Sequence, residues 1–475
     1  LSRVIGMRSA GTRVPAGEIS NWQDPAQQPA LAGKPLFDPA NPFRWVLDTT
    51  HPPPAMPEAY VEFFGGDRLP GEVLESRDGR DSRAEQLPPY LVVKTNLPLG
   101  PNETAEDVLR VSTEWVRRVV WESSVPRDYQ PGTLFMRDGR ALPFRSLRWS
   151  GTGVTLLLDE GVQTAPLVDL AEVHLPHRDS WDACFDALAV LSPDLKSRLI
   201  QWETTDGLRG TSSTERFRPE FRGDRGKPEN WVHVVQPVWS LDLMWVRFPR
   251  IRSWRFFAPH QVSLTQVGPT KVRQQSYFGS AVRWQCDRSV PGQTLNVAGQ
   301  LFPLGFGVQA DNELSFDLHP AVRSFRTQFG LDQSAGEGGC VRGMVLLETE
   351  QRRTLVRSDV LIGSKTLVDS GAQSIRTTPG QPARLVLAAD PVLEGRPKGA
   401  DPFDIRDFVD WMQPEFELDP ATVAAEIRKR SFARVAALAG WTLPANDQEQ
   451  VRLSNHWDES HPRDPRFRVL LSTDQ

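Results

Sequence analysis

The clearest pattern of apolar and polar positions lies between residues 296 and 332. Residues 314–318 and 322–329 form two runs that alternate between the two classes. Such alternation places one face of a strand against a core and the other face in water. Gly305 and Gly307 interrupt a further run, which is typical of a bulge or of a close backbone approach. This stretch therefore predicts antiparallel strands of a two-layer β-domain.

A second pattern repeats three times in the first half of the chain. The copies begin at Tyr60, Thr133 and Leu199, and each reads as a strand, a Gly/Asp turn, a second strand and a later Val-rich end. Two copies have Asp-Gly turns, at 138–139 and 206–207, which favour a tight hairpin because the turn needs positive φ. The repeat predicts three small β-barrels of the SH3 or Sm type, over residues 57–122, 130–177 and 199–266. Units this short bury little surface, so we expect them to pack on one another or on the later β-domain.

The remaining segments lack both patterns. Residues 1–56 are rich in Pro, Ala, Gly and Asp, and they predict an irregular arm. Residues 180–198 carry apolar residues at helical spacing and predict a helical linker. Residues 419–475 predict a helix over 422–438, followed by a C-terminal strand over 467–471. The expected fold class is therefore mainly β, with three SH3/Sm-like modules, one two-layer β-domain and a short helical C-terminal extension.

The region that begins near residue 276 resembles a known family. The residues that carry the resemblance are, in order, Gly305, Gly307, Val308, Ala310, Leu314, Asp317 and Leu318, then residues 329–332, 338–341, 383–387 and 407–411. On these residues, segment 276–417 is similar to the NPCBM family of carbohydrate-binding modules. The resemblance implies a jelly-roll sandwich of the galactose-binding type that binds sugar. This chain has Gln309 where the family usually has His.

Four residues of this segment are candidates for contact with a sugar: Gln309, Asp311, Asp332 and Trp411. The Gln309 amide could hydrogen-bond a ligand or simply be solvated. Asp332 is interpreted either as a contact to sugar hydroxyls or a bound calcium, or as the start of an Asx turn over residues 333–336. Trp411 could stack on a pyranose ring or fill the sandwich core, and its spacing from Phe408 favours the core.

No pattern of catalytic residues appears along the chain. The G-x-S-x-G, H-E-x-x-H, P-loop and C-x-x-C motifs are missing. Glycoside hydrolysis requires paired carboxylates, and the aspartates at 311, 332, 407 and 410 suggest such pairs, yet turn capping is the simpler interpretation. His174 and His177 are a weak metal signal. We therefore predict a chain that is not an enzyme and has no cofactor or metal site, apart from a structural calcium that the jelly roll could hold.

Composition limits the partners and the location of the protein. The formal charge of −5 gives no electrostatic footprint for nucleic acid or an anionic membrane. No run reaches the ~18 apolar residues of a transmembrane helix. The three cysteines cannot all pair, although Cys286 and Cys340 lie in one region and could form a disulfide. The chain begins with Leu, so a signal peptide could already be gone, and export is expected from the family resemblance.

Two functions remain open from the sequence. In the first, an exported, non-catalytic, multi-module protein binds carbohydrate through its jelly roll. In the second, the chain is a structural or interaction subunit of a larger protein assembly, in the cell envelope or outside the cell, with no sugar ligand. The edge strands of three small barrels and the presence of Gln309 in place of His motivate the second, because exposed edges accept strands from partner proteins.

Overall fold

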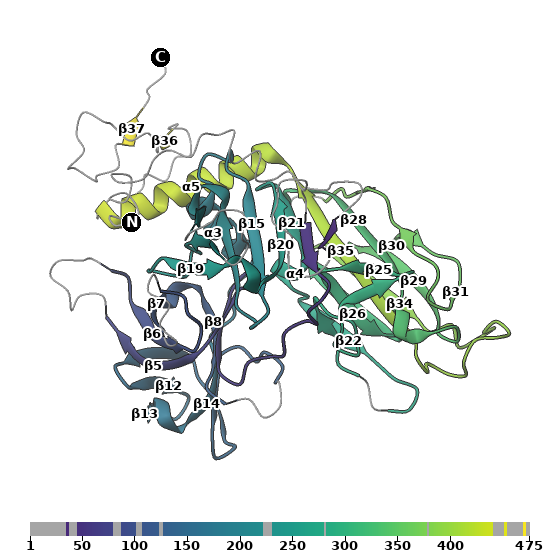
Figure 1. The fold of residues 1–475 in the computed structure, drawn as a ribbon, viewed down its shortest axis with the longest axis horizontal. Coiled ribbons are helices and arrows are strands. Elements are labelled where there is room, and N and C mark those ends of the chain that lie inside the picture. Colours follow the sequence, from purple (N-terminus) through teal and green to yellow (C-terminus); the bar gives the residue numbers. More distant parts are fainter. Residues whose placement is uncertain are drawn as a thin grey trace.

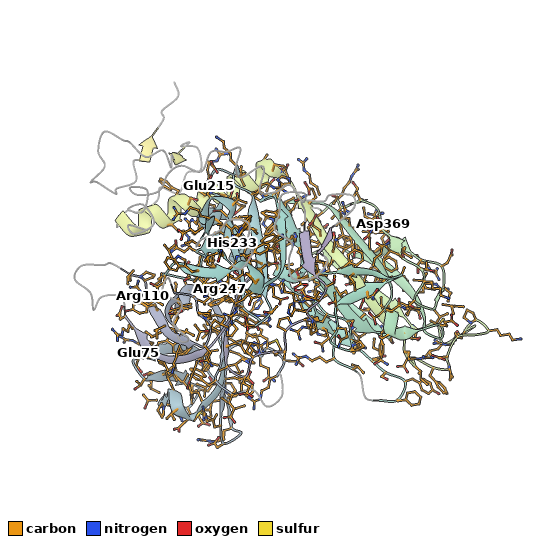
Figure 2. All side chains as sticks on the ribbon, in the orientation of Figure 1. Glu75, Arg110, Glu215, His233, Arg247 and Asp369 are labelled. Carbon is orange, nitrogen blue, oxygen red and sulfur yellow. The ribbon has the colours of Figure 1, made fainter. Side chains whose placement is uncertain are left out.

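The structure is a computed structural model that describes residues 35–37, 45–78, 87–100, 107–122, 127–221, 230–279, 282–377, 380–439, 451–453 and 469–471. Figure 1 shows two β-rich regions side by side, the earlier one in purple to teal and the later one in green to yellow. Each region has its own large hydrophobic core. In Figure 2, Glu75 and Arg110 mark the first region and Asp369 marks the second. Among the described residues, no helix is long and apolar enough to cross a membrane.

Three copies of one strand order build the first region. Each copy has a two-stranded hairpin, a three-stranded antiparallel meander, a single 3-10 turn and a closing strand. The first copy consists of β3 (Tyr60–Phe63), β4 (Arg68–Pro70), β5 (Glu72–Arg77), β6 (Tyr90–Thr95), β7 (Asp107–Ser112), η3 (Thr113–Trp115) and β8 (Val116–Val120). The second consists of β9 (Thr133–Met136), β10 (Ala141–Pro143), β11 (Ser146–Ser150), β12 (Gly153–Leu158), β13 (Gly161–Pro166), η4 (Leu167–Asp169) and β14 (Leu170–His174).

The third copy keeps this order and adds a 3-10 turn after its hairpin. It consists of β15 (Leu199–Thr204), β16 (Arg209–Ser213), η5 (Thr214–Arg216), β17 (Phe217–Phe221), β18 (Trp231–Val235), β19 (Met244–Arg247), η7 (Phe248–Arg250) and β20 (Ile251–Phe257). The two Asp-Gly hairpins are confirmed, because Gly139 and Gly207 take φ of 89° and 84° between paired strands. The likeness of each copy to an SH3 or Sm barrel stays a prediction.

The hairpins and closing strands of all three copies pair into one continuous sheet. Its order is β1-β2-β20-β15-β16-β4-β3-β8-β14-β9-β10. The β8–β14 pairing joins the first and second copies, and a bridge between Arg68 and Arg209 joins the first and third. The edges of the hairpins and closing strands therefore pair with one another, whereas each three-stranded meander keeps two edge strands outside this sheet. The expectation of an irregular arm over residues 1–56 is wrong in part, because β1 (Pro35–Phe37) pairs with β2 (Trp45–Asp48), which pairs with β20.

The second region is a two-layer β-sandwich, as the alternating pattern predicted, with the jelly-roll architecture that the family resemblance implied. One sheet has the order β23 (Gln285–Cys286), β26 (Gly305–Gln309), β35 (Phe408–Leu418), β28 (Val322–Leu331), β32 (Val368–Asp369), with β21 (Gln261–Ser263) on β35 and β33 (Gln373–Ser374) on β28. The facing sheet has the order β22 (Lys271–Gln274), β27 (Asn312–Asp317), β34 (Arg384–Asp390), β29 (Cys340–Glu348), β30 (Arg352–Arg357), with β31 (Leu361–Ile362) on β29. A small hairpin of β24 (Leu295–Val297) and β25 (Gln300–Phe302) lies beside them.

Two helices pack together beside the sandwich core, and the earlier one joins the second and third copies along the chain. The predicted linker helix is α3 (Ser180–Leu191), where Asp179 caps the N-terminus by accepting from the N–H groups of Trp181 and Asp182. The C-terminal helix α5 (Pro420–Ala439) packs against α3, and Arg430 pairs with Asp182 at 2.7 Å. Two short elements, α4 (Leu264–Val267) and η8 (Gln333–Ala335), lie within the sandwich region, and the C-terminal strand β37 (Val469–Leu471) pairs with β36 (Val451–Leu453).

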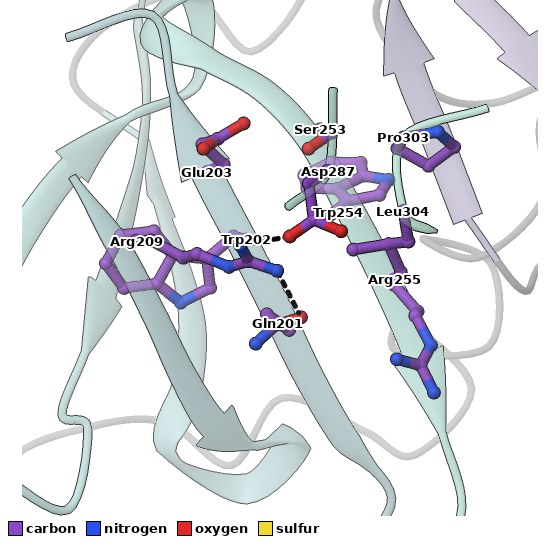
Figure 3. A pocket seen from close by; sticks show the side chains of 10 residues that line it. All are labelled: Gln201, Trp202, Glu203, Arg209, Ser253, Trp254, Arg255, Asp287, Pro303 and Leu304. Carbon is purple, nitrogen blue, oxygen red and sulfur yellow. Dashed lines mark hydrogen bonds and ion pairs between the residues drawn. The ribbon is translucent and has the colours of Figure 1, made fainter. Parts of the chain in front are cut away.

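The two regions meet at a seam of buried charged side chains. Arg209 of β16 donates through Nη1 to the Asp287 carboxylate at 2.5 Å and through Nη2 to the Gln201 side-chain oxygen at 3.2 Å. Figure 3 shows the Arg209 guanidinium lying between these two partners in a small pocket. Nearby, Arg255 of β20 pairs with Glu415 of β35 at 3.1 Å. Such pairs stabilise the seam only while both partners are present, because one partner alone leaves a buried charge without compensation.

Candidate functional site

Trp411 does not lie on a binding surface. Its side chain is fully buried on β35, and its ring packs against that of Phe329 with centroids 4.6 Å apart. The prediction that Trp411 contacts a sugar is therefore wrong, and the alternative interpretation as a core residue is confirmed. The physical reason is that the inward face of β35 closes the sandwich, so a large ring there fills the space between the sheets.

Asp332 is also buried and serves the local backbone. Its carboxylate caps η8 by accepting from the Ser334 N–H at 2.8 Å, as an Asx turn requires. The side chain also lies against Asp410 of β35. Burial, reinforced by the neighbouring Asp332 charge, raises the pKa of Asp410 well above its ordinary value. Asp332 is 3 % exposed and its carboxylate is engaged in capping η8, so a contact with a sugar stays a prediction.

Gln309 and Asp311 lie at the end of β26, where the chain crosses to β27. Gln309 is buried, and its amide Nε2 donates to the Asp404 backbone carbonyl at 3.3 Å. Asp311 is partly exposed and forms an ion pair with Arg273 at 2.7 Å. The structure thus brings Gln309 to the loop that precedes β35 and leaves Asp311 paired on the neighbouring surface.

Three exposed aromatic rings gather beside that loop. Tyr277, Phe278 and Phe403, here called the aromatic platform, are 57 %, 61 % and 39 % exposed. The Tyr277 and Phe403 rings stack with centroids 4.3 Å apart, and Phe278 meets each of them edge-on at 5.4 Å. Three large rings that pack on one another while staying exposed form the kind of apolar patch that marks binding surfaces.

Buried acceptors lie directly behind the aromatic platform. The Tyr277 N–H donates to Asp404 Oδ2 at 2.9 Å, which fixes the two platform segments to each other. The second carboxylate oxygen, Asp404 Oδ1, and the amide oxygen of Gln309 have no hydrogen-bond partner among the described residues. Asp404 is 2 % exposed and Gln309 is 8 % exposed. Buried acceptors without donors are costly, and they are satisfied when a ligand or water supplies a hydroxyl donor.

The chemistry of this surface suits a sugar. A pyranose presents an apolar C–H face that packs on an aromatic ring, and it carries hydroxyl groups that donate to carboxylate and amide oxygens. Within the described residues, His, Cys, Asp and Glu side chains do not gather in groups of three that could hold a metal ion. A structural calcium in the jelly roll stays a prediction. Cys286 and Cys340 are both free thiols, so the disulfide considered between them is not present.

A family comparison bears on the same region. Residues 261–386 match the NPCBM/NEW2 domain family. The match covers about a quarter of the chain and starts at β21, which is the first strand of the sandwich sheets. The matched range includes Tyr277, Phe278 and Gln309, while Phe403 and Asp404 lie beyond its end.

Solved structures with some likeness to the chain include carbohydrate-binding modules. A CBM51 module of Clostridium perfringens GH95, in complex with methyl-galactose, is 19 % identical and matches 33 % of this chain and 99 % of its own, with a TM-score of 0.27. CBM51-2 and INT domains of Clostridium perfringens ZmpB, in complex with GlcNAc, are 15 % identical over 44 % of this chain and 43 % of theirs, with a TM-score of 0.27. A CBM22 tandem of Paenibacillus barcinonensis Xyn10C is 7 % identical over 73 % and 97 %, at 0.22. No curated protein matches the chain.

The sequence held a partial signal for the residues that we missed. Tyr277 and Phe278 are adjacent aromatics that follow a short polar strand, and Phe403 lies in the Asp-Pro-Phe-Asp segment 401–404. Both residues lie in a turn after β22, and connecting segments run over the surface of a protein. That rule could have indicated exposed rings at Tyr277 and Phe278. It could not have shown that they lie beside Phe403, which is more than a hundred residues later in the sequence.

Proposed function

We propose that the sandwich binds carbohydrate at the aromatic platform. The observation that carries the proposal is the combination of stacked, exposed rings with the unpartnered acceptors of Asp404 and Gln309 behind them. The rings offer an apolar surface on which a sugar ring can pack. The unpaired oxygens accept hydrogen bonds from hydroxyl groups that approach in the right direction. The NPCBM/NEW2 match supports a carbohydrate ligand for the same domain.

The rest of the chain fits a non-catalytic role in this proposal. The charged side chains at the seam are paired with one another, as Arg209 is with Asp287, which suits a rigid joint rather than a reaction site. The protein is then an exported, multi-module binder whose first region carries the sandwich. Export follows from the proposed ligand, since glycans of the cell envelope and the surroundings lie outside the cytoplasm.

A glycan array probed with the full chain tests the proposal. The full chain is needed because residues of α3 and Phe257 belong to the same core as the sandwich. We expect saturable binding to at least one class among neutral hexosides, N-acetylhexosaminides and acidic sugars, confirmed by isothermal titration with the best ligand. A flat array over all three classes would overturn the proposal.

A second candidate function rests on a different surface. On the second copy, Val162 is 71 % exposed and Val168 is 69 % exposed, and Val162 belongs to β13, an edge strand of its three-stranded sheet. Exposed apolar residues on an edge strand favour pairing with a protein partner. In this candidate the chain is a subunit of a larger assembly. Purified native material would then elute as a complex in light scattering, and Val162→Lys would release the partner while leaving sugar binding intact.

A further inference from the structure

Arg396 organises the loop that carries one ring of the aromatic platform, and the inference drawn from it rests on the proposed function. The Nε of Arg396 donates to the Asp401 carbonyl at 2.5 Å, and its Nη2 donates to the two carboxylate oxygens of Asp407 at 2.9 and 3.1 Å. A third donor, Nη1, bonds the Pro391 carbonyl. One guanidinium therefore joins both ends of segment 401–407, which contains Phe403 and Asp404.

The backbone of this segment takes conformations that need support. Phe403 and Arg406 both have φ of 59°, and Val392 at the start of the same loop has φ of 49°. Residues with a β-carbon rarely adopt these left-handed values, and they hold them only where the surroundings fix the chain. The middle of the segment is restrained by the Tyr277 N–H, which donates to the Asp404 carboxylate, and by the Gln309 amide, which donates to the Asp404 carbonyl. Further restraint comes from the two ends of the segment.

The ends of the segment are tied to the body of the sandwich. The Asp407 carboxylate accepts from the Cys340 N–H at 2.7 Å, and its backbone carbonyl accepts from the Ala310 N–H at 3.0 Å. The Asp401 N–H donates to the Gly338 carbonyl at 2.7 Å. A β-carbon on Gly338 would lie 2.3 Å from the Asp401 carboxylate, so the loop packs tightly against the turn that precedes β29.

We propose that Arg396 is a positioning residue for the aromatic platform, which sets the place of Phe403 and Asp404 without touching the sugar. Its side chain is 11 % exposed and that of Asp407 is fully buried, so the guanidinium acts from below the surface. A lysine cannot substitute, because a single ammonium on a flexible stem does not reach three acceptors arranged around a plane.

Isothermal titration of Arg396→Lys with the best ligand of the array tests the proposal. The matched control is Arg342→Lys, because Arg342 is also half-buried in the sandwich and pairs with Asp390 at 3.6 Å. We expect Arg396→Lys to weaken the affinity at least tenfold and the control to change it less than twofold. Equal affinities for the two variants would overturn the proposal.

A double-variant cycle separates positioning from a general loss of stability. In a Phe403→Leu background, Arg396→Lys should cost much less affinity than it costs in the wild type, since the ring that it positions is already gone. Equal losses in both backgrounds would contradict the proposal. If the wild type binds no sugar at all, the proposed function fails by itself. Hydrogen exchange then decides the inference, because segment 401–407 should exchange faster in Arg396→Lys than in Arg342→Lys.

Discussion

The seam and the aromatic platform differ in how their buried polar groups are paired. At the seam, Arg209 bonds both Asp287 and Gln201, and the side chains of Arg209 and Asp287 are at most 11 % exposed. At the platform, aromatic rings remain exposed, and acceptors on Asp404 and Gln309 have no described donor. A surface whose groups are mutually satisfied joins parts of a chain, whereas one whose groups are not is ready for a ligand.

Exposure also distinguishes two large aromatic residues of the sandwich, Trp411 and Tyr277. Trp411 lies in motif 407–411, one of those that carry the family resemblance, and is fully buried, while Tyr277 lies in none of those motifs and is more than half exposed. Residue type is therefore a poor guide to a sugar site unless exposure is known. We expect substitutions at buried residues to change stability and substitutions at the platform to change sugar affinity. The opposite result at either place would contradict this comparison.

The largest effect is expected for Trp411→Ala. Removal of a fully buried indole should lower the free energy of unfolding by about 3–5 kcal/mol, because the cavity cannot be filled by its neighbours. Urea unfolding followed by fluorescence measures this change. The control, Phe278→Ala, removes an exposed ring and should stay within about 0.5 kcal/mol of the wild type. A Trp411→Ala protein that keeps its stability and loses its sugar affinity would reverse our assignment.

Removal of one seam partner should have the next largest effect. Arg209→Ala leaves the Asp287 carboxylate buried without its cation, which should cost about 3 kcal/mol of unfolding free energy. The matched control is Arg145→Ala, since Arg145 and its partner Asp159 are 71 % and 79 % exposed and such pairs contribute less than about 1 kcal/mol. Similar losses for the two variants would mean that the seam does not hold the regions together.

At the platform, the effect should appear in affinity and not in stability. Tyr277→Ala removes a ring that stacks on Phe403 and should weaken sugar binding about tenfold, which corresponds to ~1.4 kcal/mol. Isothermal titration measures the affinity, and thermal unfolding should shift little. Val162→Ala, at an exposed apolar site on the first region, is the control and should leave affinity unchanged.

The smallest effect concerns the buried carboxyl pair of Asp332 and Asp410. Because the folded-state pKa of Asp410 is raised, its contribution to stability is full below pH of about 4 and is lost as the pH rises through the folded pKa. Asp410→Asn carries no such charge, and its amide can donate to Asp332. The variant should therefore gain stability relative to the wild type as the pH rises. A difference that is constant from pH 4 to pH 8 would contradict the raised pKa.

Local pattern predicted the elements well. The alternation over residues 314–318 and 322–329 became β27 and β28, the Asp-Gly turns became hairpins, and the apolar spacing after residue 180 became α3. These features depend on periods of two and 3.6 residues and on the φ preference of glycine, which are properties of short segments. The family resemblance also located the sandwich, although its first strand, β21, lies before the expected start at residue 276.

Long-range arrangement could not be predicted from the same patterns. The repeat predicted three separate modules, yet the pairing of β8 with β14 joins two of them through strands about fifty residues apart. The platform likewise combines Tyr277 with Phe403, and its support by Arg396 depends on a loop whose shape no periodicity encodes. The burial of Trp411 follows from the packing of two sheets, so motif 407–411 indicated the family and yet suggested a wrong contact.

A crystal structure of the full chain with the best array ligand would test the central claim most directly. Our account predicts a pyranose ring packed against Tyr277 and Phe403, with a hydroxyl group donating to Asp404 or Gln309. A sugar bound at another surface of the sandwich, with the aromatic platform left in contact with solvent alone, would contradict it.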